Sequence, residues 1–225
     1  MIGLQVQLAP GWKIYWRSPG DAGIPPQFDW TGSKNLKQAR IFWPLPEMFH
    51  SYGFSTWGYH DEVVFPIKVT LEDLAEPLEL KLHLFYGICQ EVCIPYQHDF
   101  ALTLGAGTGS VSADATVISE FMKQVPPAIG SPMSAISQID AEILTGDKVQ
   151  ITAASDRGFK NPNIIVEGKA GTVYSLLSFK LSNDGKTAAF AVKAEIPDSE
   201  VLKGQEITIT VFDKDLAAEE TQTLR

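Results

Sequence analysis

Residues 78–104 of this 225-residue chain read LELKLHLFYGICQEVCIPYQHDFALTL. Apolar and polar side chains alternate over residues 78–85 and again over 98–104, which is the pattern of half-buried β-strands. Between these two segments lie Cys89 and Cys93, the only cysteines of the chain. The stretch therefore predicts two strands with a pair of closely spaced thiols between them.

The spacing of the two cysteines restricts the local backbone. A strand rises about 3.3 Å per residue, so an extended segment would hold the Cα atoms of Cys89 and Cys93 roughly 13 Å apart. A disulfide needs these atoms within about 7 Å of each other. If the pair forms a bond, the segment is a tight loop, a helical turn or the tip of a hairpin.

A redox-active pair is favoured over a structural disulfide by the size of the ring that the bond would close. A ring of about five residues stabilises the fold by about 2 kcal/mol, against about 4.7 kcal/mol for a loop of about 100 residues. Glu91 lies between the cysteines, and Ile88, Val92 and Ile94 are apolar neighbours. An anion and apolar surroundings keep the pKa of a thiol from falling, so we expect a moderate nucleophile.

A metal site is the alternative reading of the same segment. His83 and His98 flank the cysteine pair, and two thiolates with imidazole nitrogens suit zinc or copper(I). The alternative function is thus a copper or zinc binding module that uses Cys89, Cys93 and His83 or His98. However, the spacing is not a common zinc-finger spacing, and alternation assigns His83 to a strand.

The remaining sequence also favours an all-β protein. Short alternating segments are separated by Pro, Gly, Asn and Asp clusters, which is typical of sandwiches or barrels. One segment, 113–125, has helical periodicity, with Asp114 as a candidate N-cap and Pro126-Pro127 as a stop. Further strands are predicted at residues 4–8, 62–69, 148–152, 164–167, 187–193 and 206–212.

These patterns divide the chain into three parts. Residues 1–112 form a first domain, 113–136 a helix and a Pro/Gly-rich linker, and 137–225 a second β-sandwich. All five tryptophans and both cysteines fall in the first part. The sequence therefore places the reactive chemistry in the first domain.

Charge and hydropathy exclude two classes of partner. The formal net charge is −9, which argues against nucleic-acid binding. No segment has about 18 consecutive apolar residues, so we expect no direct membrane insertion by this segment. The first residues lack a signal-peptide pattern, but a reversible disulfide suits an exported protein, and we expect a segment of one.

The first domain resembles a known family. Its motifs are GWKIYWR at residues 11–17, PGDAG at 19–23, WPLP at 43–46 and GYHDEV at 58–63. Together with the cysteine pair, they resemble the periplasmic N-terminal domain of the thiol:disulfide interchange protein DsbD family. The resemblance covers roughly residues 4–104 and is closest to the branch that includes ScsB, a suppressor of copper sensitivity.

The resemblance implies a fold, a function and partners. The implied fold is an immunoglobulin-like β-sandwich, with a second sandwich in the ScsB-like branch, so two such domains are expected here. The implied function is periplasmic thiol–disulfide exchange. Electrons arrive from the transmembrane domain of the same full-length protein and leave to a periplasmic thioredoxin-fold protein. No cofactor and no metal is implied.

The resemblance also assigns roles to the cysteines. The second cysteine, Cys93, would attack the disulfide of the partner, and Cys89 would resolve the mixed disulfide. DsbD itself spaces its cysteines further apart than the three residues that intervene here. Loop geometry and partner choice are therefore not carried over from DsbD.

Members of this family shield their cysteine pair with an aromatic cap loop. The corresponding segment here is 49–57, and we assign Tyr52 and Phe54 as its cap residues. Tyr15 and Trp16 lie in the strand-like segment 11–17 and are assigned to core and edge packing.

Overall fold

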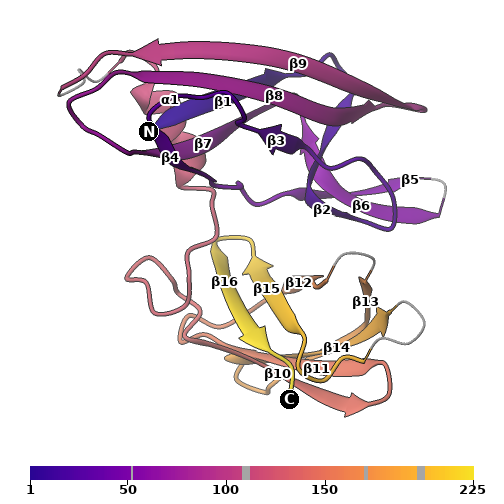
Figure 1. Cartoon of the computed structure of the whole chain (residues 1–225). Coiled ribbons are helices and arrows are strands. Elements are labelled where there is room, and N and C mark those ends of the chain that lie inside the picture. The colour runs from indigo at the N-terminus through magenta and orange to yellow at the C-terminus, as the bar shows by residue number, and fades with distance from the viewer. Residues whose placement is uncertain (52, 108–111, 170–171, 197–200) are drawn as a thin grey trace. The chain divides into compact units, whose positions relative to one another are not determined.

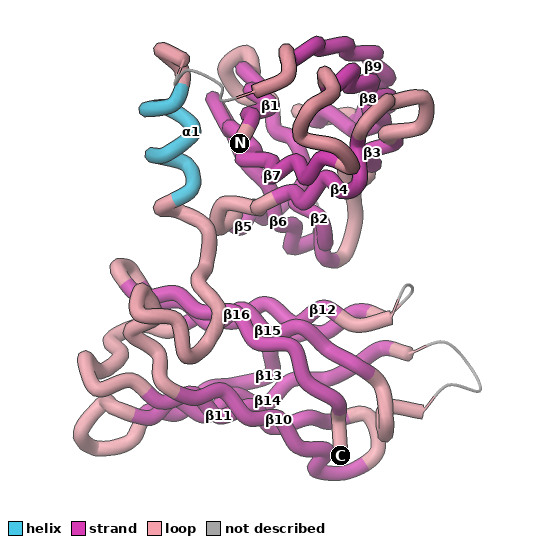
Figure 2. The backbone as a smooth tube through the Cα atoms, turned by 60° about the vertical axis from the view of Figure 1, so that its left-hand side comes forward, coloured by secondary structure: helices cyan, strands magenta, loops and turns pink. Residues whose placement is uncertain are grey.

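The computed structural model describes residues 1–51, 53–107, 112–169, 172–196 and 201–225. The chain divides into two compact units, Met1–Val125 and Pro126–Arg225. Each unit consists of antiparallel β-sheets, and the described residues contain a single helix (Figures 1 and 2). The expected class, all-β with two immunoglobulin-like β-sandwiches, is confirmed.

Two sheets build the first unit. The smaller sheet has the strand order β1-β7-β4, and the larger has the order β3-β8-β2-β6-β5, with β9 paired to the other side of β8. The strands of the smaller sheet are β1 (Ile2–Gln7), β4 (Leu36–Ile41) and β7 (Glu62–Leu71). Those of the larger sheet are β2 (Lys13–Gly20), β3 (Gln27–Asp29), β5 (Glu47–Ser51), β6 (Phe54–His60), β8 (Leu78–Cys89) and β9 (Cys93–Leu104).

The β8–β9 hairpin is the longest pairing of the first unit (Figure 1). Its register runs without a shift from Leu78 opposite Leu104 to Cys89 opposite Cys93. The strands predicted over 78–85 and 98–104 are thus confirmed, and both extend as far as the cysteines. β8 has neighbours on both sides, whereas β9 lies at an edge and is exposed along its whole length.

The core of the first unit is aromatic and aliphatic. The ring of Phe65 packs edge-on against Trp43 and Tyr59, at centroid distances of 5.0 and 5.5 Å. Tyr15 and Trp16 are buried, as the sequence predicted. From β8 the core receives four alternate leucines, Leu78, Leu80, Leu82 and Leu84.

The predicted helix is present as α1 (Ala115–Met122) and is shorter than the predicted 113–125. Asp114 occupies the N-cap position, but its side chain makes no capping hydrogen bond. The sequence assigned this helix to a connecting segment, whereas in the structure it belongs to the first unit and packs against β7. Among the described residues, no helix combines the length and apolarity needed to cross a membrane.

The second unit is a sandwich of two sheets with the orders β10-β11-β14-β13 and β12-β15-β16. Its core is mainly apolar and includes Ile151, Phe190 and Ile209, and Thr210 is also fully buried. The strands are β10 (Gln138–Thr145), β11 (Lys148–Ala154), β12 (Asn163–Glu167), β13 (Val173–Leu181), β14 (Thr187–Glu195), β15 (Glu206–Asp213) and β16 (Leu216–Thr223).

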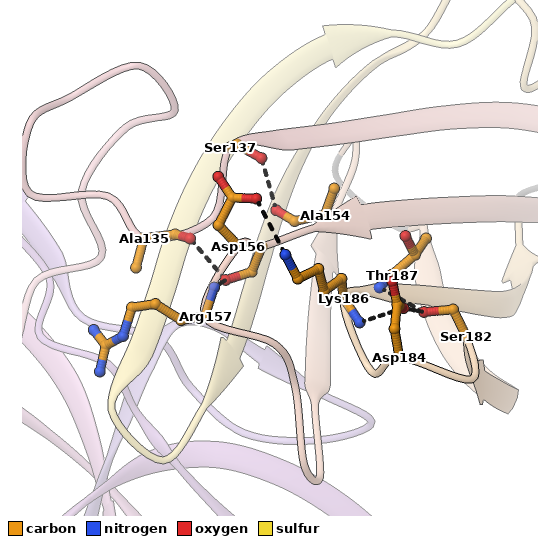
Figure 3. A network of polar contacts seen from close by, with 10 residues as sticks. Ala135, Ser137, Ala154, Asp156, Arg157, Ser182, Asp184, Lys186 and Thr187 are labelled. Carbon is orange, nitrogen blue, oxygen red and sulfur yellow. Dashed lines mark hydrogen bonds and ion pairs between the residues drawn. The ribbon is translucent and has the colours of Figure 1, made fainter.

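Polar contacts close the turns at one end of the β10-β11-β14-β13 sheet (Figure 3). The Ser155 hydroxyl donates to the carbonyl of Ala135 at 2.8 Å. In the turn before β14, the Asp184 carboxylate accepts hydrogen bonds from the Ser182 hydroxyl and from the Lys186 backbone N–H. These hydrogen bonds, with the one from Ser182 as the largest cause, lower the pKa of Asp184. The network satisfies polar groups of the turns.

We expect the substitution Gly58→Ala to destabilise the first unit. A Cβ atom at Gly58 would lie 2.3 Å from the carbonyl oxygen of Ile14, so β2 and β6 would have to separate. Overpacking of this kind costs about 1–3 kcal/mol. Urea unfolding followed by tryptophan fluorescence reports on the first unit alone, because every tryptophan lies within it.

The matched control is Gly105→Ala, since no atom lies within 4 Å of a Cβ at Gly105. The Gly58→Ala midpoint should fall well below that of Gly105→Ala. Equal midpoints for the two variants would contradict the close approach of β2 to β6.

Candidate functional site

The two cysteines form a disulfide across the tip of the β8–β9 hairpin. Cys89 ends β8, Cys93 begins β9, and the two are directly paired, with their Cα atoms 4.1 Å apart. Only three residues, 90–92, make the turn. Of the three local structures that the spacing allowed, the hairpin tip is therefore the one observed.

The two sulfur-bearing residues differ in their access to solvent. Cys89 is 2% exposed, whereas Cys93 belongs to the exposed edge strand. Val92, the turn residue that precedes Cys93, is 72% exposed. Because exchange requires in-line approach of a second sulfur, access favours attack at Cys93 and departure of the Cys89 sulfur.

One face of the larger sheet carries the groups around the disulfide. In the register, Lys13 of β2 is opposite Cys89 of β8, and Tyr15 of β2 is opposite Gly58 of β6. Paired residues of antiparallel strands project from the same face, as do alternate residues of one strand. Lys13, Tyr15, Cys89 and Cys93 therefore share a face, which we call the redox face.

Tyr15 contacts the accessible sulfur directly. Its hydroxyl oxygen lies 3.1 Å from the Sγ atom of Cys93. The sulfur carries no hydrogen in the disulfide, so the hydroxyl is the donor. Burial raises the pKa of the Tyr15 hydroxyl, which keeps the donor proton in place at neutral and mildly alkaline pH. The sequence assigned Tyr15 to packing alone, because periodicity gives its face but not its partner.

Lys13 places a cation on the redox face. Its Nζ atom lies 5.1 Å from the ring centroid of Phe49 and 5.9 Å from that of Tyr15, both within cation–π range. Burial lowers the pKa of the Lys13 ammonium. The sequence-based expectation for the thiol pKa included only Glu91 and apolar neighbours, because Lys13 is distant along the chain. A nearby cation favours the thiolate form of a cysteine and opposes the effect of Glu91.

The assignments to the cap loop fall on the β5–β6 hairpin. Tyr52 lies outside the described residues. Phe54 begins β6 opposite Ser51 and is 51% exposed. Strand alternation from Phe54 through Gly58 places its side chain on the redox face. Its assignment as a cap residue stays a prediction.

The histidines of the metal alternative lie away from the cysteines. His83 precedes Cys89 by six strand residues, which is about 20 Å, and His98 follows Cys93 by five, about 17 Å. The Nδ1 atom of His83 lies 2.7 Å from the Oδ1 atom of Asp99 instead. Across the described ranges, no cluster of three or more metal-ligating side chains occurs. The structure therefore gives the copper or zinc alternative no histidine ligand.

Comparisons with known proteins agree with this site. Residues 1–105, which contain both cysteines, match the family model described as thiol:disulfide interchange protein DsbD, N-terminal. Residues 124–225 match a domain of unknown function, DUF8393. A search of curated protein sequences found no match.

A solved structure is similar to the chain over both units. It is the crystal structure of the N-terminal periplasmic domain of ScsB from Proteus mirabilis. The TM-score is 0.76 at 26% sequence identity, and the match covers 99% of this chain and 86% of that chain. The likeness thus extends across the disulfide-bearing unit and the second sandwich.

Single-cysteine variants should reveal the difference in access between the two sulfurs. In Cys89→Ser the remaining thiol, Cys93, is exposed, whereas in Cys93→Ser the remaining thiol, Cys89, is buried. We expect Cys93 to form a mixed disulfide with glutathione disulfide roughly tenfold faster than Cys89. Mass spectrometry of quenched samples measures both rates, and faster reaction of Cys89 would contradict the assignment.

Proposed function

Because residues 1–105 of this chain form an N-terminal domain of the DsbD family, of its ScsB-like branch, we propose that the chain is a periplasmic protein-disulfide reductase module. It takes electrons from the transmembrane domain of the same full-length protein. It passes them to the disulfide of an exported thioredoxin-fold protein. Cys89 and Cys93 carry the electrons.

The observation that carries this proposal is a disulfide at a hairpin tip with one accessible and one buried cysteine. A structural disulfide gains most by joining distant segments, whereas this bond closes a ring of five residues and contributes only about 2 kcal/mol. Exchange instead needs one sulfur that a visiting thiolate reaches and one that leaves and later returns. Cys93 and Cys89 meet these two requirements.

The exchange proceeds through a mixed disulfide. In the reduced module, the Cys93 thiolate attacks one sulfur of the partner disulfide, and the other partner sulfur leaves as a thiolate. The Cys89 thiolate then attacks Sγ of Cys93, expels the first partner sulfur and restores the Cys89–Cys93 bond. Two electrons and two protons pass to the partner, so the reaction requires no organic cofactor.

The redox face supports this reaction electrostatically. The Tyr15 hydroxyl is placed to donate to Cys93, and a hydrogen bond to the charged form favours the thiolate. The ammonium of Lys13 adds a positive charge on the same face. Both groups stabilise negative charge that forms on sulfur when the bond opens. A dithiol of the transmembrane domain then reduces the Cys89–Cys93 disulfide again by the same exchange in reverse.

A periplasmic location fits the chemistry and the relative. The solved ScsB structure is of a periplasmic domain. A reversible disulfide also persists more readily outside the reducing cytosol. We therefore place the module in the periplasm, next to exported partners whose disulfides it reduces.

We expect Cys93→Ser to abolish reduction of a partner while leaving the fold intact. The variant lacks the attacking sulfur, and loss of the disulfide costs only about 2 kcal/mol. The assay mixes reduced protein with an exported thioredoxin-fold protein in its disulfide form and counts new partner thiols by alkylation and mass. Thermal unfolding of the same samples provides the control for folding.

The complementary variant, Cys89→Ser, should accumulate the mixed disulfide, because Cys93 attacks and no second thiol resolves the product. A Cys93→Ser variant that still reduces the partner, but unfolds at a far lower temperature, would identify the bond as structural.

A further inference from the structure

Residues 20–24 (GDAGI) begin at the last residue of β2 and form the first part of the connection to β3; we call this segment the strap. Hydrogen bonds attach it at both ends. The Ser55 N–H donates to the Oδ2 atom of Asp21 at 2.8 Å, and the Asp21 N–H donates to the Ser55 carbonyl at 3.1 Å. At the other end, the Gly87 N–H donates to the Ile24 carbonyl at 3.2 Å.

These two attachments join the strap to β6 and to β8. Ser55 is the second residue of β6 and lies in the β5–β6 hairpin, the segment to which the cap was assigned. Gly87 lies on β8, two residues before Cys89. The strap thus connects the cap hairpin to the strand that carries the buried cysteine.

The middle of the strap lies against the ring of Tyr15. Gly23 has a φ angle of +121°, and a Cβ atom there would lie 2.6–2.7 Å from the Cδ1, Cε1 and Cζ atoms of Tyr15. No side chain fits between the strap and the ring. The hydroxyl that lies 3.1 Å from Cys93 Sγ is bonded to Cζ, one of these three ring atoms.

The hydroxyl position depends on this contact. A tyrosine has two side-chain torsions, and a small rotation at χ1 or χ2 moves the hydroxyl by more than the tolerance of a hydrogen bond. The backbone of Gly23 blocks displacement of the ring to one side. Contacts therefore continue from Ser55 through Asp21, Gly23 and Tyr15 to the accessible sulfur.

We propose that Gly23 and Asp21 are positioning residues of the redox centre. Gly23 holds the Tyr15 hydroxyl on Cys93, and Asp21 makes that position depend on the β5–β6 hairpin. A partner that displaces the hairpin thereby weakens the contact between Tyr15 and the sulfur. This inference rests on the proposed exchange at Cys93 and adds to it the residues that set the reactivity of that cysteine.

The test uses Gly23→Ala in the Cys89→Ser background, so that Cys93 is the single thiol. The rate of mixed-disulfide formation with glutathione disulfide is measured across pH. We expect the added methyl to displace the ring and to lower the thiolate fraction at pH 7 roughly tenfold, through loss of a hydrogen bond to a charged group. The charges of Lys13 on β2 and Glu91 in the turn are unchanged in this variant.

A double-mutant cycle separates positioning of Tyr15 from a merely structural role. Tyr15→Phe should shift the pH profile in the same direction as Gly23→Ala. Adding Gly23→Ala to Tyr15→Phe should then produce no further shift. Additive effects of the two substitutions would overturn the proposal, because Gly23 would then act by another route.

The matched control is Gly130→Ala in the second unit. Gly130 has a φ of +79°, and no atom lies within 4 Å of a Cβ there, so the substitution adds backbone strain without touching Tyr15. It should leave the pH profile unchanged, and an equal shift would overturn the proposal. If Gly23→Ala does not fold, Asp21→Ala replaces it, and a shift in the same direction is expected; an unchanged profile contradicts the coupling.

The outcomes distinguish this proposal from the proposed function. If Cys93 of the Cys89→Ser parent fails to react with glutathione disulfide, the exchange function itself fails. If the parent reacts and neither strap variant changes its pH profile, only the role of the strap is wrong.

Discussion

The antiparallel register between β8 and β9 is the constraint on which the redox centre depends. It places Cys89 directly opposite Cys93, with Cα atoms close enough for a bond. Since side chains alternate between faces, a slip of one residue would send one cysteine to the opposite face of the sheet. The register is held by the alternate leucines of β8, which are buried in the core of the first unit. Packing far from the disulfide thus determines whether the sulfurs meet.

The same topology makes the two cysteines unequal. At Cys89, β8 is flanked by β9 on one side and by β2 on the other, and the residue is buried. Among the strands that the structure describes, β9 pairs with β8 alone, and Cys93 is exposed. An edge strand is ordinarily a liability, because its free backbone groups invite pairing with other chains. Here the edge position leaves Cys93 accessible to solvent, whereas Cys89 is buried.

Much of the fold was predictable from the sequence, because alternation is a local signal. It located the strands around the cysteines, the helix near residue 115 and the division into two sandwiches. The choice between loop, helical turn and hairpin tip was not predictable, since spacing fixes only a distance limit. Tyr15 is separated from Cys93 by 78 positions. The pairing of β2 with β8 brings them together, and local sequence periodicity does not reveal such a long-range pairing. Lys13 was missed for the same reason. The histidines were misleading in the opposite way: they are close to the cysteines in sequence, but extended strands carry them away.

The proposed function requires that the Cys89–Cys93 bond exchanges with other thiols and is not a permanent crosslink. The most direct measurement is the equilibrium reduction potential of the pair in glutathione buffers, determined by alkylation and mass spectrometry. Structural disulfides have potentials below about −300 mV, whereas labile and catalytic ones lie higher. We predict a value above that limit, with full reoxidation when glutathione disulfide is restored. A value below it, with resistance to reduction in the folded state, would contradict the account.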